Sequence, residues 1–555
     1  MEKIWLKHYP EGVPTEIDVD AYASIGALFE EGVRKFADRE AYICMGKSIT
    51  YAELDRLSAA FGAYLQQVIK LPPKARVALM MPNVLQYPVA MFGVLRAGYT
   101  VVNVNPLYTP RELEHQLKDS GAEAIVIVEN FAHTLEQVMG QVPIANVVVT
   151  SLGEMLGFPK GAIVDFVVRR VKKMVPAWTL PGAVRMTKAL ELGAPLKLQP
   201  VDIGHEDIAY LQYTGGTTGV AKGAVLTHRN IIANLQQAHA WIASHVQEGR
   251  EIIITALPLY HIFSLTANCL TFFKLGATNV LITNPRDIPG FVKEMSKHRF
   301  TVITGVNTLF NALLNNPDFA KLDFSSFKLA LGGGMAVQQA VAERWQTVTG
   351  NPLIEAYGLT ETSPAATINP LTITEFTHAI GLPLSSTDIS VRDEEGKEVA
   401  IGKPGELCIR GPQVMREYWN RPEETAKVFT SDGFLRTGDI ASVDEAGFVR
   451  LIDRKKDMIL VSGFNVYQNE VEDVVATHPG VLEVAAVGVP DEKSGEVVKL
   501  FVVRKDPALT KEAIIAHCRE NLTAYKVPSS IEFRDELPKT NVGKVLRRML
   551  RDGEA

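Results

Sequence analysis

Apolar residues recur at helical spacing in one part of the first third of the chain and form short unbroken runs in others. Over residues 54–68 they lie three or four positions apart, which predicts a helix. Residues 77–81, 101–104 and 124–128 are short apolar runs that predict buried strands, and residues 88–95 predict a short apolar helix. Buried strands that alternate with helices are typical of parallel α/β layers.

One helix is marked at both ends by its sequence. Thr109 is a suitable N-cap, Pro110 suits the first turn, and Glu112 completes a capping box. Gly121 is placed to end the same helix, because glycine readily adopts a left-handed conformation. The sequence therefore predicts a helix that begins after Thr109 and ends before Gly121.

The same α/β pattern is predicted to continue to about residue 450, where the dense charge run 453–457 begins. Beyond it, residues 469–477 and 511–522 predict helices, and residues 484–489 and 500–503 predict strands. A chain of 555 residues is too long for one core, since cores stop growing at roughly 250–300 residues. We therefore predict an α/β protein with a large layered N-terminal domain, 1–453, and a small mobile α+β C-terminal domain, 457–555.

Composition narrows the class of protein. The chain is 46% hydrophobic and 22% charged with a net charge of -6, which gives no indication of nucleic-acid binding. Four cysteines lie far apart, which argues against a disulfide framework or a zinc site and suits a reducing cytoplasm. The N-terminal residues lack the apolar region of a signal peptide, and the apolar stretch 262–283 is interrupted by Asn268 and Lys274.

Residues 164–178 predict a basic amphipathic helix, whose last turn Pro176 would break. Such a helix either packs on its own domain, which we favour, or lies in a lipid interface. The predicted apolar face comprises Val164, Val167, Val168, Val171, Val175 and Trp178, and the basic residues are Arg169, Arg170, Lys172 and Lys173.

The most informative run is residues 213–223, Tyr-Thr-Gly-Gly-Thr-Thr-Gly-Val-Ala-Lys-Gly. Glycines let the backbone approach a ligand, while hydroxyls and one ammonium suit a polyphosphate. The run differs from the Walker loop, because Val220 stands where that motif needs its second glycine. Its candidate binding groups are Tyr213, Thr214, Gly215, Gly216, Thr217, Thr218, Gly219 and Lys222.

Four further motifs are weak when taken singly. Gly332, Gly333 and Gly334 follow an apolar run and predict either a tight turn or a flat ligand surface. Residues 357–362 combine an aromatic ring, a hydroxyl and a carboxylate, groups that can stack on a base, reach a phosphate and hold Mg²⁺. Asp439 follows a glycine turn and suits either an Asx turn or ribose hydroxyls. Residues 539–544 place Lys544 after Gly543, either in a solvated basic tail or at a loop tip.

The order of these motifs is more specific than any one of them. With its motifs in this order, the chain resembles the adenylate-forming superfamily, which comprises acyl-CoA synthetases, luciferases and peptide-synthetase adenylation domains. The resemblance covers nearly the whole chain. More narrowly, it is similar to the bacterial long-chain fatty acyl-CoA synthetases. The segments that carry this narrower resemblance are 103–109, 258–261, and 432–439 through 453–457.

The resemblance implies a two-step reaction with ATP, Mg²⁺ and coenzyme A. A long-chain fatty acid attacks the α-phosphate of ATP to give acyl-adenylate and pyrophosphate, and coenzyme A then displaces AMP. By motif, residues 214–222 hold the outer phosphates, with Thr217 and Glu361 at the metal. The remaining nucleotide positions are Gly333 and Gly334 beside adenine, Tyr357 stacked on it, Gly358 next to that ring, Thr360 at the α-phosphate, and Asp439 with Arg454 at the ribose.

The resemblance also implies a moving lysine. Lys544 would reach the α-phosphate and the attacking carboxylate, so that a fixed cation offsets the charge of two anions. Lys456 matches the hinge about which the small domain swings after adenylation, and Gly463 would lie near the face that then meets the thiol. Gly332 and His261 would lie at the acyl pocket, although a hydrogen-bonded core histidine is an equal alternative for His261.

Several alternatives stay open at this point. Residues 257–281 and 302–314 are apolar enough either to line an alkyl tunnel or to form core. The acid could be medium-chain or aryl, or the acceptor a carrier protein, with the same catalytic residues. A fatty-acid-binding protein without catalysis is disfavoured, since a binder needs neither Glu361 nor Lys544. The resemblance also implies a homodimer, the cysteines favour a cytoplasmic enzyme, and the basic helix at 164–178 would give it peripheral contact with the inner membrane if it lies in lipid.

Overall fold

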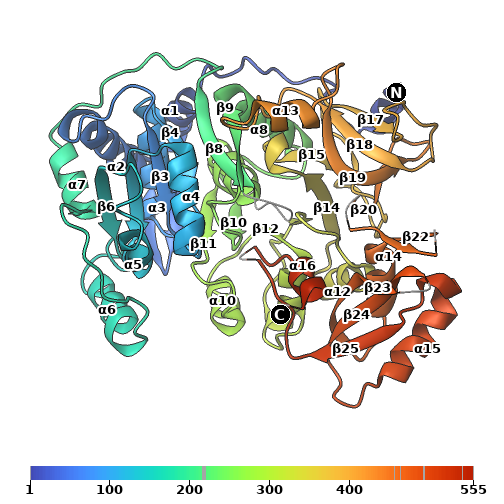
Figure 1. Ribbon diagram of the computed structural model, residues 1–555. Coiled ribbons are helices and arrows are strands. Elements are labelled where there is room, and N and C mark those ends of the chain that lie inside the picture. The colour runs from blue at the N-terminus through green and yellow to red at the C-terminus, as the bar shows by residue number, and fades with distance from the viewer. Residues whose placement is uncertain are drawn as a thin grey trace.

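The structure is a computed structural model, shown in Figure 1. It describes residues 2–214, 221–454, 457–462, 464–491, 494–540 and 542–553, and it describes Arg454 by its backbone alone. A large N-terminal part holds three sheets, and a smaller C-terminal part, red in Figure 1, lies against one side of it. The α/β class with a large and a small domain is as the sequence predicts.

The first sheet has seven strands. Five consecutive pairs are parallel, and the final pair is antiparallel. Every residue of β4 and β5 is buried, which explains why these strands appear in the sequence as unbroken apolar runs. In spatial order the strands are β7 (Val184–Arg185), β6 (Asn146–Thr150), β5 (Ala124–Val128), β3 (Arg76–Met80), β4 (Thr100–Asn103), β8 (Ile208–Thr214) and β9 (Lys222–Thr227).

The second sheet has nine strands with a parallel centre. In order they are β16 (Leu382–Pro383), β15 (Ala365–Ile368), β14 (Leu353–Gly358), β13 (Leu329–Gly332), β12 (Val302–Gly305), β10 (Ile252–Thr255), β11 (Thr278–Leu281), β1 (Glu40–Cys44) and β2 (Lys47–Thr50). Gly305 of β12 pairs with Gly332 of β13, so the carboxyl ends of these strands meet at one edge. Ligands of α/β proteins bind at such an edge.

The start and the end predicted for the helix between Thr109 and Gly121 are confirmed. Helix α4 (Pro110–Ser120) has the complete capping box of Thr109 and Glu112, and Gly121 ends it with a left-handed φ of 61°. Helices α2 (Tyr51–Ala63) and α3 (Gln86–Arg96) cover the other two predicted helices, and α2 continues through Tyr64–Val68 as a π-helical turn. The other helices of the N-terminal part are α1 (Ile25–Phe36), α5 (Ala132–Glu136), α6 (Lys160–Phe166), α7 (Met186–Gly193), α8 (His228–Ile242), α9 (Thr271–Lys274), α10 (Ile288–Met295), α11 (Asn307–Leu314), α12 (Gln339–Thr349) and α13 (Pro422–Val428).

The third sheet corrects the prediction that the α/β pattern continues to residue 450. Strands β17 (Asp388–Arg392), β18 (Gly405–Arg410), β19 (Leu435–Val443) and β20 (Val449–Arg454) form an antiparallel sheet. Its chain alternates buried with part-exposed residues in β19, because an antiparallel sheet has one face away from the core. The change of pattern therefore comes about sixty residues before the charge run.

The C-terminal part has a sheet and a core of its own. Its strands are β21 (Ile459–Val461), β22 (Phe464–Val466), β23 (Val481–Asp491), β24 (Gly495–Arg504) and β25 (Ser530–Arg534), and its helices are α14 (Gln468–Ala476), α15 (Lys511–Asn521) and α16 (Arg547–Asp552). Val471, Val484, Leu500 and Ile514 are buried together between sheet and helices. The last strand of the third sheet ends at Arg454 and the first strand here begins at Ile459, on either side of the predicted boundary.

The predicted amphipathic helix is displaced. Helix α6 continues as the π-helical turn η4 (Val167–Val171), so the helical stretch begins before residue 164 and ends well before residue 178. Val168 is buried but Val171 is 64% exposed, so the predicted apolar face is not a single face. Among the helices that the structure describes, none combines the length and apolar character needed to span a membrane.

Candidate active site

A cavity of about 1640 Å³ lies where the edge of the second sheet meets the third sheet and the C-terminal part. It brings together predicted site residues that are up to 330 positions apart in the chain. Those that line it are Thr214, Lys222, His261, Gly332, Gly333, Gly334, Tyr357, Gly358, Thr360, Glu361, Asp439 and Lys544.

Bare backbone forms one wall of the cavity. At Gly333 a Cβ atom would lie 2.9 Å from the carbonyl oxygen of Ala356 and 3.3 Å from the ring of Phe263. Gly334 has a φ of +77°, which disfavours any other residue there. Gly333 and Gly334 therefore line the cavity without side chains of their own, and their role as a flat ligand surface stays a prediction.

Tyr357 and Asp439 meet across the cavity. The phenol of Tyr357 donates a hydrogen bond of 2.6 Å to Oδ2 of Asp439, and Asp439 is 4% exposed. Strand pairing sets Asp439 opposite Arg454, so the two predicted ribose-binding residues are neighbours on β19 and β20. This arrangement offers an aromatic face and a fixed carboxylate at adjacent points of the wall.

Glu361 belongs to a network that the sequence did not reveal. The phenol of Tyr418 donates a hydrogen bond of 2.6 Å to Oε1 of Glu361. Nζ of Lys222 lies 4.6 Å from the Tyr418 ring centroid and 3.1 Å from Oε2 of Glu424. Burial and the Glu361 carboxylate raise the pKa of Tyr418 well above its usual value, so its hydroxyl stays a donor. The network joins the metal candidate to the lysine that ends the phosphate loop.

The phosphate loop is framed by its two flanking strands. Thr214 at the end of β8 pairs with Lys222 at the start of β9, and both residues line the cavity. Gly215, Gly216, Thr217, Thr218 and Gly219 lie outside the described residues, as do Lys456 and Gly463. The two residues that flank the glycine-rich run, Thr214 and Lys222, therefore both lie at the cavity.

Tyr213 does not line the cavity, although the next residue, Thr214, does. Its ring is 8% exposed in a hydrophobic cluster, and its hydroxyl donates a 2.7 Å hydrogen bond to Asp119. Successive side chains of a strand point to opposite faces, so Thr214 turns toward the cavity and Tyr213 turns away from it. The structure thus assigns Tyr213 to the core rather than to a nucleotide site.

Lys544 is presented by a hairpin that docks on the N-terminal part. Gly543 has a φ of +82°, and its carbonyl oxygen accepts a 2.9 Å hydrogen bond from the hydroxyl of Thr308. Nζ of Lys544 lies 3.9 Å from the point where a Cβ atom of Gly334 would stand. Burial lowers the pKa of His261 to about 3, and the Lys544 ammonium acts in the same direction, so His261 is neutral near pH 7.

An apolar arm extends the cavity away from this lysine. Ile242 of α8, Phe272 of α9, Val302 at the start of β12 and Leu329 at the start of β13 line it. Val302 and Leu329 each lie three positions, or roughly 10 Å, before the glycine at the end of their strand. Part of the 257–281 and 302–314 segments therefore lines a cavity, and the rest packs in the core.

Comparison with known proteins places this site in a class. Residues 29–419 match the family of AMP-binding enzymes, and residues 470–544 match the AMP-binding enzyme C-terminal domain. The chain belongs to this family of adenylate-forming enzymes.

Within the family, the chain is similar to curated bacterial proteins over their full length. It is 59% identical to the long-chain-fatty-acid–CoA ligase of Yersinia pestis, covering 100% of this chain and 98% of the relative. It is 55% identical to the protein of the same description in Haemophilus influenzae, covering 100% and 99%. A crystal structure of the anthranilate CoA ligase AuaEII in complex with anthranoyl-AMP matches with a TM-score of 0.85 and 25% identity, covering 97% of this chain and 99% of that one.

Proposed function

We infer that this enzyme activates long-chain fatty acids with ATP and transfers the acyl group to coenzyme A. The carboxylate oxygen attacks the α-phosphorus, and the bond from that phosphorus to the bridging oxygen breaks to release pyrophosphate. The thiolate then attacks the acyl carbon, and AMP leaves. The observation that carries this inference is that the separate motif residues line one cavity, in a chain 59% identical to such ligases.

Lys544 serves the first step in this proposal. Its ammonium stands beside the glycine wall, where the α-phosphate and the carboxylate have to approach each other. A preorganised positive charge at that point stabilises the transition state more than the separated anions. Because the lysine acts as a charge, it needs no lowered pKa.

The nucleotide is held by the rest of the wall. Tyr357 with Gly333 and Gly334 takes the adenine, Asp439 with Arg454 takes the ribose hydroxyls, and Thr360 takes the α-phosphate. The hydrogen bond between Tyr357 and Asp439 supports the first two roles, since it fixes both groups before a ligand arrives.

Mg²⁺ fits Glu361 and the phosphate loop. Mg²⁺ is commonly bound by one or two carboxylates together with substrate phosphates. Glu361 supplies one carboxylate at the cavity, its orientation fixed by Tyr418. Thr217 and the glycines of the loop would complete the site with the outer phosphates, and the metal would offset their charge.

The second step requires the small domain to move. We propose domains 1–453 and 457–555 with a hinge at Lys456, so that a rotation withdraws Lys544 and admits the thiol. Support comes from the docking of the hairpin through the Gly543 carbonyl and of β23 through a 2.9 Å bond from Asn311 to the Leu482 carbonyl. Hydrogen bonds of this kind contribute only about 0.5–1.5 kcal/mol each, so they are readily exchanged.

Three further expectations belong to this proposal. The enzyme is cytoplasmic, contacts the inner membrane from its cytoplasmic side, and forms a homodimer. Light scattering on the purified chain tests the last of these.

The function is tested by measuring AMP formation from ATP with a panel of saturated acids, with and without coenzyme A. The proposal expects long-chain acids to give AMP and acyl-CoA when coenzyme A is present. Transfer only to a carrier protein, or activity confined to aryl acids, would replace it. Identities of 55–59% over the full chain favour neither of these alternatives.

A further inference from the structure

The segment between β6 and β7, residues 151–183, exposes an unusual number of apolar side chains, and we call it the excursion. Among the described residues, five of the twelve exposed large hydrophobic side chains lie within residues 158–174. Their exposed fractions are 92% for Phe158, 60% for Ile163, 61% for Phe166, 64% for Val171 and 51% for Met174. We call these five residues the outer face. In Figure 1 the excursion, labelled α6, projects from the lower edge of the N-terminal part.

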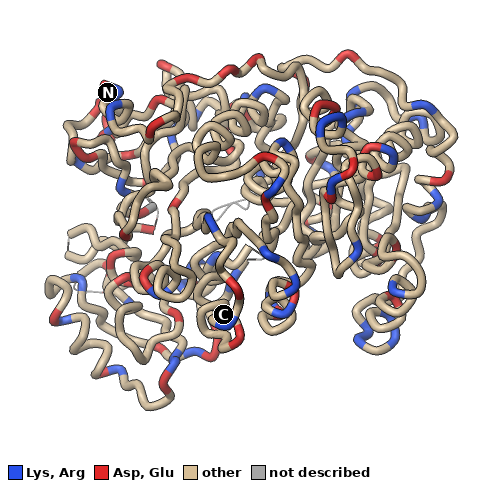
Figure 2. The backbone as a smooth tube through the Cα atoms, turned by 180° about the vertical axis from the view of Figure 1, so that it is seen from behind, with Lys and Arg blue, Asp and Glu red and all other residues tan. Residues whose placement is uncertain are grey.

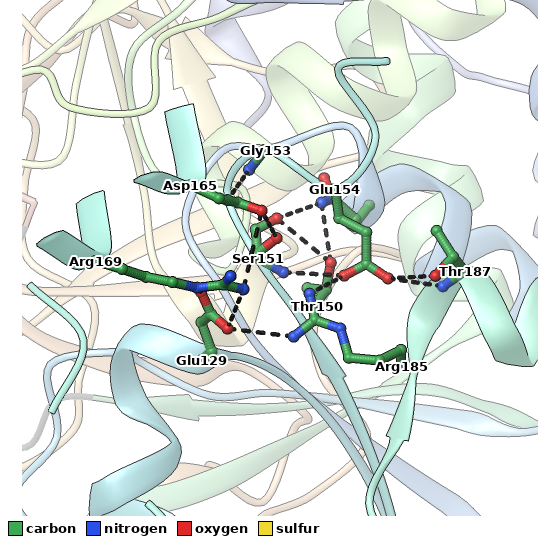
Figure 3. Close-up of polar contacts among 10 residues, drawn as sticks. Glu129, Thr150, Ser151, Gly153, Glu154, Asp165, Arg169, Arg185 and Thr187 are labelled. Atoms are coloured by element: carbon green, nitrogen blue, oxygen red, sulfur yellow. Dashed lines mark hydrogen bonds and ion pairs between the residues drawn. The ribbon is translucent and has the colours of Figure 1, made fainter. Parts of the chain in front are cut away.

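The opposite side of the excursion is fixed to the body, as Figure 3 shows. Arg169 of η4 donates two hydrogen bonds, of 2.7 and 2.8 Å, to the carboxylate of Glu129. Asp165 of α6 accepts hydrogen bonds from the Ser151 hydroxyl at 2.7 Å and from the Gly153 main chain at 2.8 Å. The Glu129 side chain is 4% exposed and the Arg169 side chain 42%, so the carboxylate end of this pairing is shielded from solvent.

The far end of the excursion joins the same network. Arg185 of β7 contacts Glu129 at 3.2 Å and Glu154 at 2.7 Å, and Glu154 also accepts from the main chain of Thr187 at 2.8 Å. Val168, which is 9% exposed, packs beneath the helix. Asp165, Val168 and Arg169 therefore hold the inner side of the helix against the body, which leaves the outer face toward solvent.

Positive charge accompanies the outer face. Residues 158–175 hold five cations and one carboxylate, although the whole chain has a net charge of -6. Asp165 and Arg169 are engaged in the inner network, whereas Arg170, Lys172 and Lys173 are exposed. In Figure 2 the excursion is the lobe at lower right, and blue segments mark its free end.

We propose that the outer face, with Arg170, Lys172 and Lys173, is the surface by which this enzyme rests on an anionic lipid bilayer. The proposal rests on the membrane contact stated above and assigns its place. Aromatic and aliphatic side chains enter the boundary between headgroups and acyl chains, while neighbouring cations pair with lipid phosphates. The combination favours lipid over a protein partner, because outward cations stand beside two exposed phenyl rings while the segment's carboxylate is turned inward.

A fluorescent label tests the contact directly. All four native cysteines are buried, so Ile163→Cys introduces a selectively reactive thiol into the outer face. An environment-sensitive dye on that thiol should shift to shorter wavelength with phosphatidylglycerol vesicles, and much less with phosphatidylcholine vesicles. The same dye on Ile401→Cys, an exposed site at 44% in the third-sheet region, should not shift. Equal shifts at the two sites, or no shift at Ile163→Cys, overturn the proposal.

Vesicle sedimentation of variants gives the second measurement. We expect Phe158→Glu with Phe166→Glu to weaken binding to phosphatidylglycerol vesicles at least tenfold, and each of Arg170→Glu and Lys172→Glu to weaken it about fivefold. Ile401→Glu and Lys403→Glu are matched controls that should bind as the unaltered enzyme does. Unchanged binding of the double variant overturns the proposal.

Two readouts separate this proposal from others. Activity on a water-soluble acid without vesicles should be unchanged in the double variant. This assay reports the proposed reaction alone, so its failure is distinguished from a failure of lipid binding. If light scattering shows that the double variant alters self-association while vesicle binding persists, the outer face joins two copies of the chain and the lipid proposal falls.

Discussion

Glu361 is oriented by a phenol 57 positions away in the sequence. Tyr418 donates to its carboxylate and packs beneath the Lys222 ammonium, so one ring positions both the metal candidate and the loop lysine. A charge-assisted hydrogen bond of this kind contributes about 1.5–3 kcal/mol, more than a neutral one. The orientation of a metal ligand by its hydrogen-bond partner commonly sets metal affinity.

Tyr418→Phe should therefore lower kcat/KM for Mg–ATP by roughly tenfold or more while the acid's KM changes little. The thermal midpoint should fall by a few degrees at most, because the ring remains. Steady-state kinetics at varied Mg²⁺ gives the measurement. Tyr22→Phe, which removes a 3.3 Å hydrogen bond to Glu31 outside the cavity, is the control and should leave both parameters unchanged. A normal Mg²⁺ dependence in Tyr418→Phe would show that Glu361 needs no positioning.

At the scale of elements, the hairpin that carries Lys544 depends on one glycine. Gly543 combines a φ of +82° with a close approach, since a Cβ atom there would lie 2.7 Å from the Thr308 hydroxyl. The hairpin can therefore dock on α11 only while this position has no side chain.

Gly543→Ala should slow the first half-reaction by more than the roughly five- to thirtyfold that a left-handed non-glycine residue costs alone (about 1–2 kcal/mol), because the added Cβ atom would also meet the Thr308 hydroxyl. Acyl transfer from supplied acyl-adenylate to coenzyme A should change less, because the proposed rotation withdraws the hairpin before that step. Gly553→Ala is a matched control: its φ is +72° but no atom lies within 4 Å of the added Cβ. If both variants slow adenylation equally, the cause is backbone strain rather than docking.

Elements with local signals were predictable and those with long-range causes were not. The caps of α4, the buried strands β3 to β5 and the glycines after β13 follow from neighbouring residues alone. Tyr418 could not be assigned to Glu361, because their meeting depends on how three sheets pack. The helical stretch over 160–171 differs from the predicted one because polar contacts hold its inner side: Arg169 pairs with the buried Glu129, and Asp165 accepts from Ser151. Apolar periodicity does not indicate such contacts.

For the whole molecule, the buried carboxyl of Glu355 and the half-buried carboxyl of Asp473 lie at the junction of the two parts. Burial first, and then Asp473 of α14, raise the pKa of Glu355 of β14 to about 8. Burial, followed by Glu472 and Glu470, raises the pKa of Asp473 to about 7. Glu472 is itself paired with Arg547, and Glu470 is paired with Lys526. Among the described residues no donor reaches Oε2 of Glu355.

Both carboxyls therefore favour their neutral forms in this arrangement. Since their pKa values are raised above ordinary ones near 4, the stabilisation is full at low pH and is lost as pH rises toward about 8. Glu355→Gln should make the fall of the thermal midpoint between pH 5 and 8 shallower. Glu395→Gln, an exposed substitution, should leave that slope unchanged. Parallel slopes for Glu355→Gln and the unaltered enzyme would contradict this account.

The proposed hinge gives a second prediction for the whole molecule. Lys456→Pro should reduce acyl transfer to coenzyme A more than adenylate formation, because a fixed φ restricts rotation after the first step. Separate assays of the two half-reactions make the comparison, with Lys456→Ala as a control that retains both. Equal loss of the two half-reactions would place the hinge elsewhere.

The central claim is that Lys544 supplies charge to the first half-reaction alone. The most direct test compares Lys544→Ala with the unaltered enzyme in acid-dependent pyrophosphate release and in acyl transfer from supplied acyl-adenylate. Pyrophosphate release should fall by roughly a hundred- to a thousandfold in Lys544→Ala, with a much smaller change in acyl transfer. Undiminished pyrophosphate release, or an equal loss in both assays, would contradict it.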